Sequence, residues 1–147
     1  MNNPAISYTS NLLGVDWEAL TASLTADNFD NGRTPQQLRI SFENSHVACF
    51  AWADGHIIGK ARAISDGVCS AYVVDVWTHS DYRKRGIASE MMRRLMDKLD
   101  GQHVYLQADQ DVVGFYARLG FAEQAAGRQE AENMSDVEYV AVQRDSP

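Results

Sequence analysis

The sequence predicts one α/β domain built on a mixed β-sheet. Apolar residues recur at helical spacing in some segments and alternate with a period of two in others. The resulting order is two helices, three antiparallel strands, a helix, a strand, a helix and a strand, which is typical of a layered α/β domain. The length of 147 residues suits a single hydrophobic core. We therefore expect residues 1–147 to form one domain.

The N-terminal part predicts a short strand over residues 6–9 and then two helices. Asp16 is a favourable N-cap for a helix over residues 17–29, because its carboxylate can accept hydrogen bonds from the first backbone N–H groups. Thr34 has the same position before a second helix over residues 35–45, whose first residue is proline.

The middle of the chain predicts three antiparallel strands. Residues 46–67 form a hairpin centred on Asp54-Gly55, a dipeptide that favours a tight turn. A second Asp-Gly pair at residues 66–67 leads into a strand over residues 70–80. Strict alternation places Tyr72, Val74, Val76 and Thr78 on one face of this strand and Ala71, Val73, Asp75 and Trp77 on the other. Because both sets contain apolar residues, we expect a central strand covered on both faces.

The C-terminal part predicts two helices and two strands. The helix over residues 87–99 carries an apolar stripe and is closed by Gly101. The stripe consists of Ile87, Met91, Met92, Leu95 and Leu99. A strand over residues 103–108, a short helix over residues 111–120 and a last strand over residues 138–143 follow.

Composition and charge exclude several classes of function. The chain has 13 Lys and Arg against 20 Asp and Glu, a formal net charge of −7, which excludes a protein that coats nucleic acid through a positive surface. The first residues lack the regions of a secretory signal, and no apolar run approaches a membrane span. We therefore expect a cytoplasmic protein. Cys49 and Cys69 are expected to be free thiols, and no spacing of His or Cys indicates a metal site.

Residues 78–89 carry the strongest indication of function. They lead from the end of a buried strand directly into a helix, whose first backbone N–H groups lack intrahelical partners. Three basic and two small residues lie in this turn: Arg83, Lys84, Arg85, Gly86 and Ala88. The sequence therefore predicts a cradle for a pyrophosphate, although a basic helix start is often no more than a solvated end. The glycine motifs of P-loops and of dinucleotide sites are absent from the sequence.

Two signatures in this chain resemble those of the GNAT superfamily of acyl-CoA-dependent N-acyltransferases. Residues 83–88 are similar to the family's Arg/Gln-x-x-Gly-x-Gly/Ala turn, and residues 115–121 are similar to its Phe-Tyr-x-x-x-Gly-Phe signature. The two stand in the family's order at its usual separation. Residues 62–67, followed by Ala71 and Asp75-Val76, are also similar to small bacterial members and their plastid relatives, some of which acetylate arylalkylamines or protein lysines.

This resemblance implies a single-domain, mostly antiparallel mixed sheet with a splayed central strand pair and helices on both faces. It also implies acetyl-CoA as co-substrate, with no metal. Main-chain groups at Val76 and Thr78 would hold the pantetheine chain. The residues expected to contact coenzyme A are Val76, Trp77, Thr78, Arg83, Lys84, Arg85, Gly86, Ile87, Ala88, Ser89, Asp109 and Tyr116. Asp109 departs from the Asn of many members, and a carboxylate can accept from pantetheine amides but cannot donate.

Acetyl transfer from a thioester to an amine requires two proton transfers. The amine must lose a proton, and the departing thiolate must be protonated or stabilised. Within the motif, Tyr116 is expected to protonate the sulfur. Asp75 is expected to be the general base, because burial raises the pKa of a carboxyl group. Alternatively Asp75 pairs with Arg62, and Asp66, His79 or a water relay takes the proton.

The acceptor is expected to be a primary amine, on a small molecule or a lysine side chain, that receives the acetyl group directly in a ternary complex. The resemblance places its pocket between the first two helices and around the central strand, with Phe29, Asp30, Arg33 and Asp66 as candidates. Trp52 and Trp77 either join this pocket or are core residues. Residues 82–98 have six basic and two acidic side chains (6 − 2 = +4), so the other 130 residues sum to −11. This acidic remainder favours a cationic acceptor.

Two interpretations from other classes stay open. The chain could be a regulator that binds acyl-CoA without turnover. It could also be an interaction protein that forms a homodimer when its last strand, over residues 138–142, pairs with a second copy.

Overall fold

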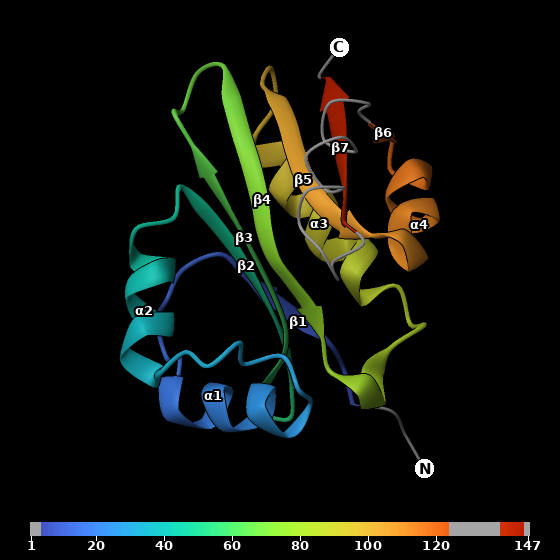
Figure 1. Ribbon diagram of the computed structural model, residues 1–147. Coiled ribbons are helices and arrows are strands. Elements are labelled where there is room, and N and C mark those ends of the chain that lie inside the picture. The colour runs from blue at the N-terminus through green and yellow to red at the C-terminus, as the bar shows by residue number, and fades with distance from the viewer. Residues whose placement is uncertain (1–3, 124–138, 146–147) are drawn as a thin grey trace.

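A computed structural model describes residues 4–123 and 139–145, in which a twisted sheet lies between helices (Figure 1). In this described part, seven strands form the sheet in the order β1-β2-β3-β4-β5-β7-β6. The strands are β1 (Ser7–Thr9), β2 (Val47–Ala53), β3 (His56–Ser65), β4 (Ser70–Thr78), β5 (His103–Asp109), β6 (Ala122–Glu123) and β7 (Tyr139–Asp145). The helices are α1 (Trp17–Ala26), α2 (Pro35–Glu43), α3 (Ile87–Lys98) and α4 (Val113–Arg118), with short 3₁₀ turns η1 (Ser80–Tyr82) and η2 (Gln110–Val112). The predicted α/β class and element order are confirmed, and β6 is added.

Local sequence explains where the first two helices begin. The Asp16 carboxylate accepts a hydrogen bond from Ala19 N at 3.0 Å, as predicted for the N-cap of α1. Thr34 and Gln37 form a capping box at the start of α2, in which each side chain accepts from the other residue's backbone N–H.

The two central strands of the sheet, β4 and β5, separate about halfway along their length. β4 and β5 are parallel and pair over Ser70–Val73 and His103–Leu106. Beyond this point β4 continues against β3 as far as Thr78, while β5 continues against β7 as far as Asp109. A gap therefore opens between the strands toward the end of β4 where η1 begins, visible in Figure 1. This confirms the splayed central pair.

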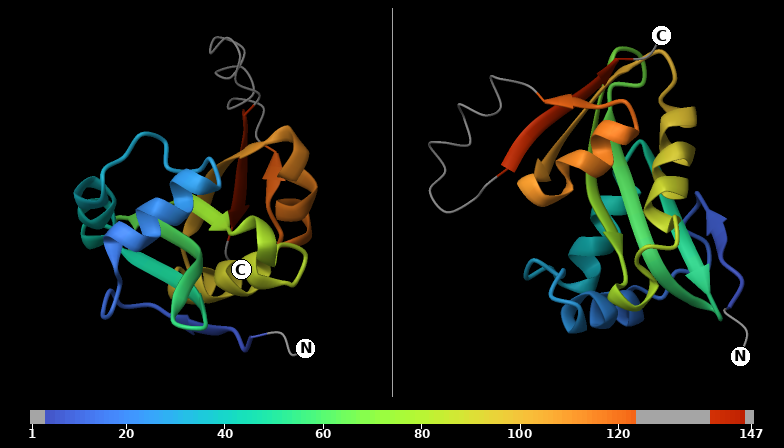
Figure 2. Two further views of the ribbon diagram at one scale, coloured as in Figure 1. Left: turned by 90° about the horizontal axis from the view of Figure 1, so that it is seen from below. Right: turned by 90° about the vertical axis from the view of Figure 1, so that its right-hand side faces the viewer.

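Helices cover both faces of the sheet (Figure 2). On one face α3 buries its predicted stripe of Ile87, Met91, Met92, Leu95 and Leu99, none of which is more than 2% exposed. On the other face α1 and α2 pack a second core against β2, β3 and β4 through Leu20, Leu24, Leu38 and Phe42.

β4 does not alternate strictly. Two of its residues, Asp75 and Val76, stand opposite one residue of β3, and Asp75 has a φ of 61°. This extra residue is a β-bulge, which reverses the side to which the following residues point. Val73 therefore lies in the α3-side core, whereas Trp77 lies in the core under α1 and α2. The prediction that these two residues share a face is wrong because the alternation restarts at the bulge.

The last predicted strand corresponds to β7, although residue 138 lies outside the described residues. β7 pairs with β5 along one side and with β6 at Val142 and Gln143 on the other. β6 therefore covers the outer side of this strand only at Val142 and Gln143, and pairing with a second copy stays a prediction. Cys49 and Cys69 are free thiols, as predicted. Within the described residues, no helix is long and apolar enough to cross a membrane.

Candidate active site

The start of α3 has the geometry predicted for an anion cradle. Gly86 is the N-cap of α3 and has a φ of 76°. As a glycine, it has no side chain that could cap the helix. A Cβ atom at this position would meet nothing within 4 Å. The first backbone N–H groups of α3 lack intrahelical partners and lie at the positive end of the helix dipole.

Arg83 connects this turn to the loop between α1 and α2. Its Nε donates to the Thr78 carbonyl at 3.2 Å, and its Nη2 lies 3.5 Å from Asp27 Oδ2. Its guanidinium also lies 5.4 Å from the centre of the Phe29 ring. Arg83 therefore holds the end of β4 next to the loop in which the acceptor pocket is expected.

The next two basic residues face solvent. Lys84 and Arg85 are exposed and form no ion pair with any residue that the structure describes. The Arg85 guanidinium lies over the Tyr82 ring at 5.1 Å. Of the following residues, Ile87 is buried in the α3-side core, and Ala88 and Ser89 are half-buried. Positive charge without a partner therefore gathers where the helix dipole also favours an anion.

The backbone of β4 can offer hydrogen bonds to the gap. His79 N donates to the Ile58 carbonyl of β3 at 2.7 Å. Because backbone N–H directions alternate along a regular strand, the N–H group of Thr78 points away from β3. The Trp77 side chain is only 3% exposed within the core under α1 and α2. It is therefore a core residue, one of the two alternatives that the sequence left open.

Tyr116 lies in α4, which contacts η2, β6 and β7, and its side chain belongs to the α3-side core. Its ring packs edge-on against Phe115 and Phe121, with centroids 5.0 and 5.9 Å away, and the residue is 8% exposed. Burial raises the pKa of Tyr116 to about 12. The hydroxyl therefore remains protonated at neutral pH and can donate a proton. Asp109 is exposed at the end of β5, where it precedes η2 without a capping hydrogen bond from its side chain.

Asp75 lies at the bulge and is surrounded by cations. Its carboxylate accepts from Arg62 Nε at 2.6 Å and Arg33 Nη1 at 2.7 Å, and Lys60 Nζ lies 3.5 Å away. Burial raises the pKa of Asp75, but these cations outweigh it and hold the pKa well below its usual range. The expectation of a raised pKa is wrong, and a carboxylate held by three cations is a poor base. The alternative, pairing with Arg62, is confirmed.

Asp66 does not join the other candidates. Its carboxylate accepts from the backbone N–H groups of Val68, Cys69 and Ser70 in the turn between β3 and β4, and these bonds lower its pKa. The turn lies at the opposite end of β4 from Thr78, roughly 25 Å away at ~3.3 Å per residue. Asp66 therefore shapes a turn, and its expected place in the acceptor pocket is wrong.

His79 also has a structural contact. Its Nδ1 accepts from the backbone N–H of Asp81 at 3.0 Å at the start of η1. In the neutral ring the proton is then on Nε2, and Nδ1 is not available to receive the proton of an amine.

The loop between α1 and α2 reaches the bulge of β4. Its Arg33 contacts Asp75, and its Phe29 is 41% exposed under Arg83. The Asp30 carboxylate accepts from Gly32 N at 3.2 Å within the loop itself. Of the three predicted loop residues, the structure therefore brings Arg33 to the central strand and Phe29 to Arg83, while Asp30 shapes the loop.

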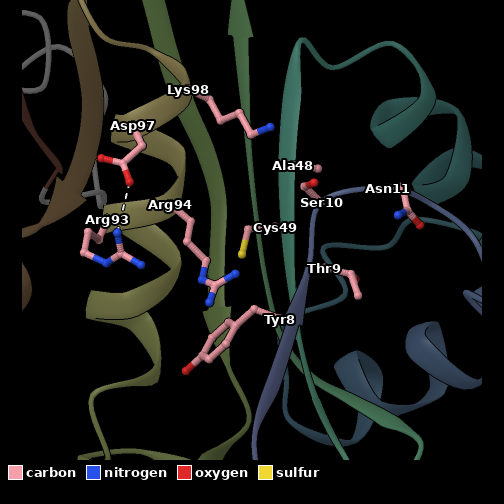
Figure 3. Close-up of a pocket in the computed structure, with 10 residues that line it drawn as sticks. All are labelled: Tyr8, Thr9, Ser10, Asn11, Ala48, Cys49, Arg93, Arg94, Asp97 and Lys98. Atoms are coloured by element: carbon pink, nitrogen blue, oxygen red, sulfur yellow. Dashed lines mark hydrogen bonds and ion pairs between the residues drawn. The ribbon is translucent and has the colours of Figure 1, made fainter.

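A separate groove of about 530 Å³ lies between β1 and α3 (Figure 3). Its lining includes Tyr8, Cys49, Arg94 and Lys98 and none of the residues predicted to contact coenzyme A. On this part of α3, Arg93 and Arg94 are paired with Glu90 at 2.5 and 2.7 Å. Much of the positive charge of residues 82–98 is therefore neutralised along α3, and its unpaired excess lies mainly at the helix start.

The acetyltransferase (GNAT) family model matches residues 15–121, which include the gap, the turn before α3 and Tyr116. The chain belongs to the GNAT family. Acetyl-CoA is the acetyl donor used across this family.

Individual relatives agree with the family assignment. A chloroplastic serotonin N-acetyltransferase of Oryza sativa is 34% identical over 119 residues, which cover 74% of this chain and 58% of that protein. The crystal structure of a candidate acetyltransferase from Deinococcus radiodurans has a TM-score of 0.69 and 33% identity, with 82% of this chain and 83% of that one covered. The chain spans between half and three fifths of the length of the first curated GNAT relatives that it matches.

A more distant neighbour shows the GNAT fold alone. An N-acetylglutamate synthase from Neisseria gonorrhoeae, complexed with coenzyme A and N-acetyl-glutamate, has a TM-score of 0.69 at 11% identity. The matched region covers 99% of this chain and 36% of the synthase chain.

Sequence reasoning missed one residue of this GNAT site. Lys60 of β3 is 1% exposed and touches Asp75, yet it was not among the candidates. A lysine within a strand of apolar and small residues is the signal that could have found it, because a buried ammonium needs a partner.

Proposed function

We propose that this chain transfers an acetyl group from acetyl-CoA to a primary amine, directly and within a ternary complex. The observation that carries the proposal is the separation of β4 from β5 after Val73, in a chain whose β4 leads through η1 to the N-terminus of α3. These elements would provide a place for an extended chain and for a phosphate group, and Tyr116 of α4 would provide the proton donor.

The start of α3 would bind the pyrophosphate of acetyl-CoA. Backbone N–H groups of Ile87 to Ser89 and the side chains of Lys84 and Arg85 supply donors and positive charge there. The pantetheine chain would then lie along β4 in the gap, hydrogen-bonded to the main chain at Val76 and Thr78. A backbone N–H in this segment would also stabilise the negative charge that develops on the thioester oxygen.

The transfer itself forms one bond and breaks another. The neutral amine attacks the thioester carbonyl, the new C–N bond forms, and the C–S bond breaks. Tyr116 would give its proton to the departing sulfur, which suits a hydroxyl whose raised pKa keeps it protonated. The amine proton would pass to water, because Asp75 is held by cations and Asp66 lies at the far end of β4.

The test is release of thiol from acetyl-CoA with a panel of arylalkylamines, polyamines, lysine peptides and amino acids. We expect turnover with at least one class, and we expect Tyr116→Phe to lower kcat by about 100-fold or more while coenzyme A binding is kept. Tyr105→Phe, which removes the hydroxyl of a half-buried tyrosine on β5, is the matched control and should leave kcat unchanged.

Two outcomes would count against the proposal. Coenzyme A binding without turnover on any amine would indicate a regulator that binds acyl-CoA. Full activity of Tyr116→Phe would refute the role of Tyr116 and leave the transfer itself intact.

A further inference from the structure

Four ionisable side chains meet at the bulge of β4, on the face of the sheet that α1 and α2 cover. Arg33 comes from the loop between these helices, Lys60 and Arg62 come from β3, and Asp75 comes from β4. Arg33 Nη1 and Arg62 Nε share one oxygen of the Asp75 carboxylate, while Lys60 Nζ lies near the other and 3.2 Å from the Asp75 carbonyl. We call these four side chains the bulge cluster.

The bulge cluster has too little negative charge. Three cations surround one carboxylate, which gives 3 − 1 = +2, and no other carboxylate of the described residues forms an ion pair with any of the three. Lys60 is 1% exposed, and burial lowers its pKa to about 8 even though Asp75 acts in the opposite direction. Uncompensated charge inside a protein is unfavourable, so the cluster would be stabilised by a further anion.

Arg33 also has hydrogen-bonding capacity left over. Its Nη1 and Nε are bonded to Asp75 and to the Asp30 carbonyl, but its Nη2 is buried and has no partner among the described residues. A buried donor without an acceptor is rare and unfavourable in a folded protein. An oxygen of a bound molecule would supply the missing acceptor.

The bulge cluster lies where an acceptor would meet the acetyl group. β4 and β5 part after Val73, so Asp75 stands at the opening of the gap and next to Val76. The side chains of Arg33 and Arg62 are 20% and 15% exposed, so solutes can reach the edge of the cluster. A molecule that touches both guanidinium groups would therefore lie beside Asp75, close to the point where β4 and β5 separate.

We propose that the acceptor amine carries a carboxylate, which binds to Arg33 and Arg62 in the bulge cluster. This inference rests on the proposed acetyl transfer, in which the C–N bond forms at the amine of the same molecule. Guanidinium groups suit a carboxylate because their paired N–H donors match its two oxygens. The acidic remainder of the chain favours cations, but over distances beyond about 10 Å that effect is screened, and the local charge decides.

Matched pairs of acceptors test this proposal on the wild-type protein. Each pair differs only by a carboxylate, such as tryptamine and tryptophan, or phenethylamine and phenylalanine. A peptide with a free amino-terminal residue beside an acidic side chain is compared in the same way with a peptide that lacks this acidic side chain. We expect kcat/KM to be at least tenfold higher for the member with the carboxylate. Equal or better turnover of the plain amines would overturn the inference and leave the proposed function standing.

A binding measurement reads the bulge cluster without turnover. Calorimetry with 3-phenylpropionate, in the presence of coenzyme A, is expected to show binding that Arg33→Gln weakens by about tenfold or more. Absence of binding to the wild type would overturn the inference even if the chain acetylates amines. Binding without any thiol release would support the inference and refute the proposed function.

Variants separate recognition of the carboxylate from a structural role. Arg33→Gln should raise KM about tenfold or more for the carboxylate acceptor and change KM for the plain amine less than twofold. Arg33→Lys keeps the charge and should recover part of the loss, which covers the case in which the Gln variant folds poorly. Arg39→Gln on α2, at an exposed arginine paired with Glu43, is the control and should change neither KM. Equal effects on both acceptors would assign Arg33 to stability alone.

Discussion

At the scale of single residues, Asp75 shows that partners outweigh burial in deciding what a carboxyl group can do. Burial on its own raises the pKa of such a group, as the sequence led us to expect. The bulge turns Asp75 toward Lys60, Arg62 and the loop residue Arg33, and their charges reverse the direction of the shift. The same three contacts make Asp75 less suitable as a base. They also connect β4 to β3 and to the loop between α1 and α2.

Replacement of Asp75 should therefore affect stability before chemistry. Asp75→Asn leaves three cations together without a counter-charge, and we expect a loss of about 3–5 kcal/mol in the free energy of unfolding. Urea denaturation measures this loss. Asp81→Asn, at an 81% exposed carboxylate, is the matched control with an expected change below about 0.5 kcal/mol. A stable Asp75→Asn with only kcat reduced would restore Asp75 as the base.

The lowered pKa of Lys60 predicts that the stability of the folded chain depends on pH in the alkaline range. Its pKa is lowered from 10.5 to about 8 by burial, so between these values the folded chain binds fewer protons than the unfolded chain. Stability therefore rises with pH in this window because of Lys60. We expect the difference in free energy of unfolding between wild type and Lys60→Met to grow in favour of wild type from pH 8 to pH 10. A constant difference across this range would contradict the lowered pKa.

At the scale of elements, the start of α3 depends on one backbone conformation. Gly86 has a left-handed φ and no neighbour near the place of a Cβ, so conformation rather than space requires glycine there. The first backbone N–H groups of the helix then lack intrahelical acceptors and lie at the positive end of its dipole. The strand before it contributes through its main chain, which explains how Trp77 can be a core residue within the same segment.

Two substitutions at Gly86 separate conformation from contact. Gly86→Val should lose about 1–2 kcal/mol of stability and weaken coenzyme A binding, because a β-branched residue disfavours the left-handed region. Gly86→Asn should keep most of both, because Asn tolerates that region. Thermal unfolding and calorimetry with coenzyme A measure the two effects. Equal weakening by both variants would indicate that the missing side chain, and not the backbone angle, is required.

At the scale of the whole molecule, charge is distributed unevenly. The net charge of −7 hides two positive regions: the exposed turn before α3 and the half-buried bulge cluster on the acceptor side. The first region precedes α3, and the second lies at the bulge of β4. An acidic protein could therefore bind, as we propose, a pyrophosphate at the first region and a carboxylate at the second.

This distribution predicts that the position of a charge matters more than its sign. Lys84→Ala should raise the Kd for coenzyme A about three- to tenfold and reduce its dependence on salt, because Lys84 has no partner at the start of α3. Lys98→Ala changes the net charge equally but lies beside the groove between β1 and α3. It should leave the Kd unchanged, and equal effects of the two variants would refute a localised anion site.

By itself the sequence determined the order of elements, the caps of α1 and α2, the stripe of α3 and the signature turn. These features depend on residues close together in the chain, so local hydrogen bonding and periodicity are sufficient to predict them. The uneven charge of residues 82–98 could also be read from the sequence, although the pairing of Arg93 and Arg94 with Glu90 could not be inferred from the sum alone.

Only the tertiary structure decided what the central strand does. The bulge at Asp75, the burial of Lys60 and the approach of Arg33 join residues as far as 42 positions apart in the chain, which periodicity does not relate. One extra residue in β4 reverses the faces of the strand, and that change assigns Asp75 to an ion cluster and Trp77 to the core. Charges held close together with little water between them interact strongly, so their three-dimensional arrangement, and not their composition, sets the chemistry of this site.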